Sequence, residues 1–251
     1  MRILVISDIH ANLEALEACL EGAPSYDAVW NLGDLVGYGA SPNQVIAAAR
    51  PLGACFVRGN HDKACSGLCS LEGFNPMAAA AAMWTQQELT PENLNWLRAL
   101  PKGPVPPSET ANTHCVHGSP LDEEAYLINL QDAVRPLAQA KVPFTFFGHT
   151  HIQGGFATSG DDWITLRPTY KGSRGPEHQA MRLQPRVRYL INPGSIGQPR
   201  DGDPRAAFAL FEDEKAVVTF YRIPYNIKSA QQKIHAAGLP LRLALRLAEG
   251  H

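Results

Sequence analysis

Five short motifs in the sequence are rich in side chains that bind metal ions. They are Asp8-x-His10, Gly33-Asp34, Gly59-Asn60-His61-Asp62, His114-x-x-His117-Gly118 and Gly148-His149-Thr150-His151. Together they offer two carboxylates, one amide and four imidazoles as metal ligands, namely Asp8, His10, Asp34, Asn60, His117, His149 and His151. One tetrahedral zinc site with an open position uses only three protein ligands, so this set suits two metal ions better than one.

The donor types narrow the choice of metal. Oxygen and nitrogen ligands without a thiolate favour manganese, iron, zinc, cobalt or nickel over magnesium or calcium. We therefore expect two divalent transition-metal ions, with manganese as the first choice in an assay. Asp34 is the natural bridge, because an anionic carboxylate can span two cations and reduce their repulsion. Each motif alone is weak evidence, since a buried histidine with a satisfied hydrogen bond is common; the ordered set carries the prediction.

Each motif follows or ends a short apolar run. The runs are Ile3–Ile6, Ala28–Leu32, Cys55–Val57, Cys115–Val116 and Phe144–Phe147. Continuous apolar runs of this length predict strands buried on both faces. Ligands bind beyond the carboxyl ends of such strands, so the motifs converge if the strands are neighbours. His149 and His151 would share one face if their segment continued as a strand.

Helical patterns alternate with these runs. Apolar residues recur at helical spacing over residues 13–20, with Gly22 as a stop. Further helix starts are expected at Ser41-Pro42 and Thr90-Pro91. Alternating strands and helices favour an α/β fold.

The last third of the chain has a different pattern. Ala207–Phe211 and Ala216–Ile223 flank an acidic turn and predict a hairpin. A helical tail is expected over about residues 226–251. We predict one domain, residues 1–251, of two packed sheets with outer helices.

Composition excludes several classes of protein. The 251 residues are 45% apolar and 18% charged, which is typical of a compact globular chain rather than a disordered one. The formal net charge of −2 disfavours a broad nucleic-acid-binding surface. No run is long enough for a membrane span, and the first apolar run is too short for a signal peptide. Five cysteines without a framework spacing suggest reduced thiols and a cytoplasmic location.

In their order, the five motifs resemble those of the calcineurin-like metallophosphoesterase family. The matching patterns are D-x-H, G-D, G-N-H-D, H-G and G-H-T-H, and Asn192–Ser195 resembles a further family signature. Asp34–Pro42 and Gln198–Pro204 look like a bacterial and archaeal branch of predicted phosphoesterases, which are similar to diadenosine-polyphosphate hydrolases. The resemblance covers about residues 1–155 and 189–223.

The resemblance implies a four-layer α/β/β/α sandwich of two mixed sheets flanked by helices, with a dimetal site at the carboxyl ends of the strands. One metal would be held by Asp8, His10, Asp34 and His151, and the other by Asp34, Asn60, His117 and His149. The implied reaction is hydrolysis of a phosphate ester by a metal-bridging hydroxide that attacks phosphorus. A phosphodiester or nucleotide is the first expectation for the substrate. Alternatives are a dinucleoside polyphosphate, a protein or small-molecule phosphomonoester, and a non-catalytic scaffold of this fold.

Several further residues are candidates for the reaction. His61 would protonate the leaving group or contact phosphate, and Asp62 would orient a histidine or cap a loop. Asn12 would contact phosphate or cap the first helix. Tyr38 and Arg200 would contact substrate or pack at the surface.

The segment 167–188 is locally basic, with six basic residues against one acidic residue. The segment belongs to an insertion-like stretch of about residues 156–188. Two interpretations are open: a flexible arm over the site, or a solvated loop. The expected partner is a phosphorylated small molecule or a nucleotide, with no membrane. Nucleic acid is possible but not favoured.

Overall fold

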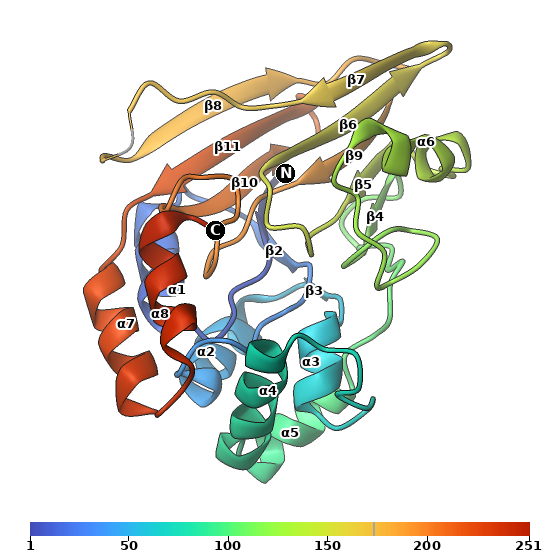
Figure 1. The fold of residues 1–251 in the computed structure, drawn as a ribbon. Helices are drawn as coiled ribbons and strands as arrows, with labels where there is room; N and C mark the ends of the chain where they lie inside the picture. Colours follow the sequence, from blue (N-terminus) through green and yellow to red (C-terminus); the bar gives the residue numbers. More distant parts are fainter. Residues whose placement is uncertain (173) are drawn as a thin grey trace.

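The computed structural model describes residues 1–172 and 174–251. Two β-sheets pack against each other, and helices lie outside them (Figure 1). This arrangement confirms the predicted α/β sandwich of two mixed sheets. No helix among the described residues is both long and apolar enough to cross a membrane.

The first sheet has six strands in the order β3-β2-β1-β10-β11-β8. They are β1 (Arg2–Ile6), β2 (Ala28–Asn31), β3 (Cys55–Phe56), β8 (Glu177–Arg182), β10 (Ala206–Glu212) and β11 (Val217–Ile223). β1, β2 and β3 run parallel, whereas β10, β11 and β8 join them through antiparallel pairs. The parallel half carries the first three motifs at its carboxyl ends.

The second sheet has five strands in the order β4-β5-β9-β6-β7. They are β4 (Thr113–Cys115), β5 (Phe144–Phe146), β6 (Gly154–Ser159), β7 (Asp162–Leu166) and β9 (Arg188–Asn192). β4, β5 and β9 are parallel, and β6 pairs antiparallel with both β9 and β7. This sheet is therefore also mixed, and the last two motifs follow β4 and β5.

Helices form the outer layers. They are α1 (Leu13–Gly22), α2 (Pro42–Ala49), α3 (Asn60–Cys65), α4 (Pro76–Glu88), α5 (Pro91–Arg98), α6 (Leu130–Ala138), α7 (Ile227–Ala236) and α8 (Leu241–Glu249), with a 3-10 turn η1 (Arg50–Leu52). α1 and α2 bury Leu16 and Ile46 against the six-stranded sheet. α6 buries Leu137 against Leu190 of the other sheet. The order is helix, sheet, sheet, helix, as the family resemblance implies.

The first strand shows how the sequence specifies these layers. Its side chains alternate between faces, because the period of a strand is two. Ile3 and Val5 join the core between the sheets, whereas Leu4 and Ile6 join the core beneath the helices. A strand buried on both faces must be apolar at every position, and this explains the continuous apolar run.

The predicted helix starts are confirmed. The Asn12 side chain accepts a hydrogen bond from the backbone N–H of Ala15 at 3.2 Å, and the Thr90 side chain accepts one from Asn93 at 3.3 Å. Pro42 is the first residue of α2, where its missing N–H costs nothing. The C-terminal hairpin is also present, as β10 and β11.

The basic segment 167–188 differs from both expectations. Glu177–Arg182 pairs with β11 as an edge strand of the first sheet, and Arg188 begins β9 inside the second sheet. Arg205 donates hydrogen bonds to the backbone carbonyls of Gly172 and Gly175, at 2.8 and 2.7 Å. The interpretation as a flexible arm or a solvated loop is therefore wrong for the paired residues. Backbone pairing with strands distant in sequence determines their structure, and charge patterning does not reveal such pairing.

We predict that Phe146→Ala destabilises the protein strongly. Phe146 is fully buried between the sheets and contacts the rings of Trp30 and Phe211, with centroids 5.6 and 5.2 Å away. Its truncation should lower the free energy of unfolding by about 3–5 kcal/mol, since lost burial and a residual cavity add up. Denaturant unfolding measures this change. Ile164→Ala on exposed β7 is the control, with an expected change within about 0.5 kcal/mol; equal losses would contradict the packing argument.

Candidate metal centre

The motif loops meet at one edge of the sandwich. In the first sheet, Ile6 lies opposite Asn31, and Asn31 lies opposite Phe56, so β1, β2 and β3 end level with one another. β4, β5 and β9 of the second sheet are aligned in the same way. The polar residues that follow these strands therefore start from one edge, as the sequence predicts.

Hydrogen bonds to Asp8 join the loops of the two sheets. The backbone N–H of His149 donates to the Asp8 carboxylate at 3.1 Å. The Ser195 hydroxyl and the Gly197 N–H donate to the Asp8 carbonyl at 2.8 and 2.9 Å. Gly148 permits this approach, because a Cβ there would lie 2.0 Å from the Ser7 hydroxyl oxygen.

Backbone strain is concentrated in these loops. Among the described residues, nine non-glycine residues have positive φ, and seven of them lie in the motif loops: Asp8, His10, Ala11, Asp34, Tyr38, His149 and His151. Each such conformation costs about 1–3 kcal/mol and persists only where the surrounding structure imposes it. A cluster of strained residues is typical of a functional site.

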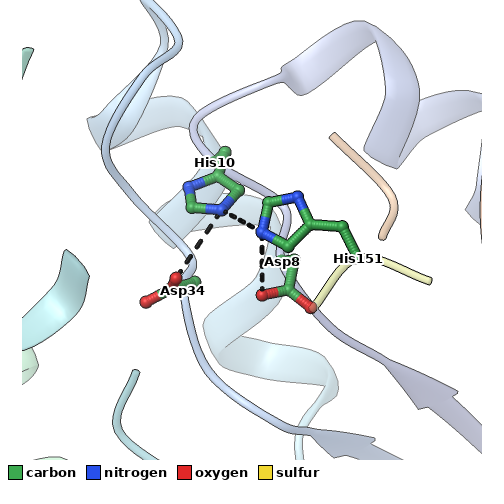
Figure 2. Close-up of side chains that lie close together, drawn as sticks. All are labelled: Asp8, His10, Asp34 and His151. Atoms are coloured by element: carbon green, nitrogen blue, oxygen red, sulfur yellow. Dashed lines mark hydrogen bonds and ion pairs between the residues drawn. The ribbon is translucent and has the colours of Figure 1, made fainter. Parts of the chain in front are cut away.

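The first ligand group consists of Asp8, His10, Asp34 and His151 (Figure 2). The Nε2 atoms of His10 and His151 lie 3.1 Å apart. His10 Nε2 is 3.6 Å from the Asp34 carboxylate, and His151 Nε2 is 3.4 Å from that of Asp8. All four residues are buried, and their ligand atoms lie within 4.8 Å of one another.

The second group shares Asp34 and adds His117 and His149. His117 Nε2 lies 3.3 Å from the Asp34 carboxylate and 3.1 Å from the Asn60 side-chain oxygen. The structure thus brings together all seven donors named from the sequence, in two groups that meet at Asp34. His114, three residues before His117, stays outside both groups on β4.

The hydrogen bonds of the imidazoles indicate what these groups bind. Three rings place Nδ1 against a backbone carbonyl: His10 at 3.2 Å, His117 at 2.8 Å and His151 at 2.6 Å. When Nδ1 donates its proton there, Nε2 presents a lone pair to the neighbouring carboxylates. Lone pairs and carboxylates at such distances repel unless a cation lies between them. The donor set therefore fits divalent metal ions.

The pKa values have the same physical origin. Burial lowers the pKa of His10 and His151 well below the usual value and that of His149 to about 3. Burial also opposes the charged form of His117, but the Asp34 carboxylate beside it raises the pKa of His117 to about 9. Neutral imidazoles are the form that binds metal, whereas at His117 a proton and a metal compete for the same lone pair.

His149 differs from the other three imidazoles. Its Nε2 lies 3.1 Å from the Glu124 carbonyl, which leaves Nδ1 as its ligand atom. The Tyr126 ring stacks on it, with centroids 3.8 Å apart. His149 and His151 lie in a loop with positive φ rather than on a strand, and they face different groups, so the expectation of one shared face is wrong. Tyr126 could not be predicted from the sequence, because no motif marks its loop.

For Asp62 and Asn12 the sequence leaves two roles open, and the hydrogen bonds favour the structural role in both cases. The Asp62 carboxylate accepts hydrogen bonds from the backbone N–H groups of Gly59, Asp34 and Val36, at 3.0, 2.8 and 3.3 Å. It holds the Asp34 loop and has no hydrogen bond to a histidine within residues 1–172 and 174–251. Asn12 uses its oxygen as the cap of α1 and donates its amide to the Gly197 carbonyl at 2.9 Å, so it is a structural residue.

The remaining candidates lie beside the ligand groups. The His61 ring packs between His10 and Tyr38, with centroid distances of 4.9 and 4.3 Å, and its buried Nδ1 has no partner among the described residues. Burial lowers its pKa to about 4. Arg200 lies over the Tyr38 ring at 5.8 Å. His61 and Arg200 therefore flank the centre, and each has a buried nitrogen without a partner among the described residues.

Comparisons with known proteins agree with this geometry. The calcineurin-like phosphoesterase superfamily domain matches residues 1–216. An uncharacterized protein of Methanocaldococcus jannaschii is 36% identical over 250 residues, which are 99% of this chain and 98% of that protein. The crystal structure of a metallophosphoesterase from Sphaerobacter thermophilus is 40% identical, with a TM-score of 0.86 over 100% of this chain and 99% of that chain.

A more distant relative matches only part of the chain. The symmetrical bis(5'-nucleosyl)-tetraphosphatase of Erwinia tasmaniensis is 31% identical over 106 residues, which are 40% of this chain and 39% of that enzyme. The family match spans most of the chain and all five motifs, and members of this family depend on two metal ions. The chain therefore belongs to the calcineurin-like phosphoesterase superfamily and is a phosphoester hydrolase.

Proposed function

We propose that this protein is a dimetal hydrolase of phosphodiester bonds in nucleotide-type substrates. The observation that carries the proposal is the convergence of two buried ligand groups on the single carboxylate of Asp34. In this proposal Asp8, His10, Asp34 and His151 hold one metal. Asp34, Asn60, His117 and His149 hold the other. Manganese is the first choice for reconstitution.

When bound, the two metals supply charge neutralisation for the phosphate and activation of a water for attack on phosphorus. The protein's own groups position them. The backbone N–H of His61 donates to Asp34 at 2.8 Å and fixes the shared carboxylate. Asp62 fixes the backbone of the same loop. The His61 ring, unpartnered beside His10, serves as a donor to an oxygen of the phosphate or of the leaving group.

A dinucleoside polyphosphate is the second candidate substrate. Partial similarity to the symmetrical bis(5'-nucleosyl)-tetraphosphatase favours it, and the phosphoanhydride bond of such a substrate breaks by the same metal chemistry.

The five free cysteines support a reducing, cytoplasmic location. We also propose that residues 1–251 act as one domain, because one core joins strands from both sheets.

We predict that Asp34→Asn and His117→Ala abolish metal binding and turnover. Reconstituted protein should contain near two manganese ions per chain and hydrolyse bis-p-nitrophenyl phosphate, and a chelator should remove both properties. Each variant should lose more than about 100-fold in activity, because even outer partners of metal ligands contribute about 10–100-fold. Elemental analysis and steady-state kinetics measure the two effects.

His114→Ala is the matched control for His117→Ala. It removes a histidine from the same segment, outside both ligand groups, so metal content and turnover should stay within twofold of the original. If metal-loaded protein fails to hydrolyse phosphodiesters, phosphomonoesters and dinucleoside polyphosphates alike, the proposed function is wrong and the scaffold alternative holds.

We predict that His61→Ala lowers kcat without removing metal. Loss of a positioned proton donor reduces rates by about 10²–10⁴-fold. The loss should be larger for an alkyl leaving group than for p-nitrophenolate, which leaves without protonation. Kinetics with a series of phosphodiesters, together with metal analysis, tests this role. Equal losses across the series would exclude leaving-group protonation, and loss of metal would show that His61 mainly supports the ligands.

A further inference from the structure

Two arginines share one aromatic ring beside the metal centre. The guanidinium carbons of Arg200 and Arg246 each lie 5.8 Å from the centroid of the Tyr38 ring. Arg200 lies in the loop after β9, whereas Arg246 lies near the C-terminal end of α8. The fold thus brings together two cations that are 46 residues apart in sequence.

Tyr38 is fixed against the metal ligands. Its ring contacts that of His10 at 4.7 Å and that of His61 at 4.3 Å. Its φ of +61° lies in the left-handed region, which is costly for a tyrosine. Gly39 allows the loop to lie close, because a Cβ there would be 2.3 Å from the His10 carbonyl oxygen. Both guanidinium groups are therefore held one aromatic ring away from a proposed metal ligand.

Neither guanidinium pairs with an acidic side chain. Within residues 1–172 and 174–251, Arg200 and Arg246 form no ion pair with an aspartate or a glutamate. Arg200 donates to the Gln198 side-chain oxygen at 3.0 Å, and its buried Nε has no partner among these residues. Arg246 donates its Nε to an oxygen of His251, the last residue of the sequence, at 2.5 Å. Gln198 and His251 thus account for one nitrogen of each guanidinium group, and the remaining N–H donors have no aspartate or glutamate partner in the described part of the chain and can serve an anion.

α8 is anchored where it presents Arg246. Leu243 and Leu247 are buried in a cluster that includes Ile234 of α7. The N–H of Gly202 donates to the carbonyl of Gly250 at 3.0 Å, which ties the end of α8 to the loop that carries Arg200. The two arginines are therefore held together by packing and backbone bonding rather than by each other.

We propose that Arg200 and Arg246, on the Tyr38 platform, form a subsite for a second phosphoryl group of the substrate. This inference rests on the proposed function: the reacting phosphate lies at the metals, and the adjoining phosphate lies between the guanidinium groups. Guanidinium groups suit this position, because they pair with phosphate through two parallel hydrogen bonds and remain charged. The substrate class is then a compound with at least two linked phosphates.

The test compares the binding of adenosine monophosphate and adenosine diphosphate, which differ by one phosphoryl group. Calorimetry with manganese-loaded protein in saturating Mn²⁺ should give at least about tenfold tighter binding of the diphosphate. Arg246→Gln and Arg200→Gln should each reduce this ratio towards one. Arg242→Gln, outside the subsite, should leave metal content and kcat for bis-p-nitrophenyl phosphate within twofold.

Arg242→Gln is the control for Arg246→Gln. It removes the same charge from α8, but Arg242 is half exposed and paired with Glu249, so the ratio should not change. Equal affinities of the original protein for the two nucleotides, or an unchanged ratio in Arg246→Gln, would overturn the subsite. Failure of the subsite and failure of the proposed function give different results. If the proposed function is wrong, turnover is absent on every phosphate ester, whereas the ratio of the two nucleotide affinities is unaffected.

Discussion

The Asp34 carboxylate lies between imidazoles of both ligand groups and is almost completely buried. Burial of an anion costs several kcal/mol unless hydrogen bonds or counter-charges offset the cost. Backbone N–H groups supply part of that compensation, since His61 donates to Asp34 and His149 donates to Asp8. The lone pair of His10 still faces the same carboxylate, whereas Nε2 of His117 faces it with a proton that a metal ion would displace. Bound cations would complete the compensation, so metal binding would also stabilise these loops.

This constraint explains the unusual backbone of the site. A ligand group works only if its donor atoms stay within a fraction of an ångström of the required positions. The left-handed conformations of Asp8, Asp34 and His151 aim the side chains inward, and the level ends of β1 and β2 fix the loops from which they start. Rigid packing between the sheets, with Phe146 against Trp30, holds that edge in place.

The metal ligands could be predicted from local sequence motifs, whereas residues whose roles depend on tertiary partners could not. Each of the five motifs is a short contiguous stretch that follows an apolar run. The strands before the motifs and the seven donors could therefore be predicted from the sequence. Asn12 and Asp62 could not be assigned, because their partners are backbone groups at Gly197 and Asp34, far away in the chain. The strand Glu177–Arg182 was missed for a similar reason, since its pairing with β11 determines it. Arg246 carries no motif, and only the packing of α8 brings it to Tyr38.

The residues proposed for catalysis and a residue proposed for substrate specificity lie in different parts of the chain. The family match ends at residue 216, and α7 and α8 lie beyond it. In the proposed reaction, charge would develop on the oxygens of the phosphate at the metals, so groups around Asp34 would act on the transition state. A cation that holds a neighbouring phosphate binds the ground state and the transition state almost equally, which lowers KM and leaves kcat unchanged. Arg246 can therefore set which phosphate compounds are retained without altering the reaction, and a terminal helix is a position where such a preference can change independently of the catalytic loops.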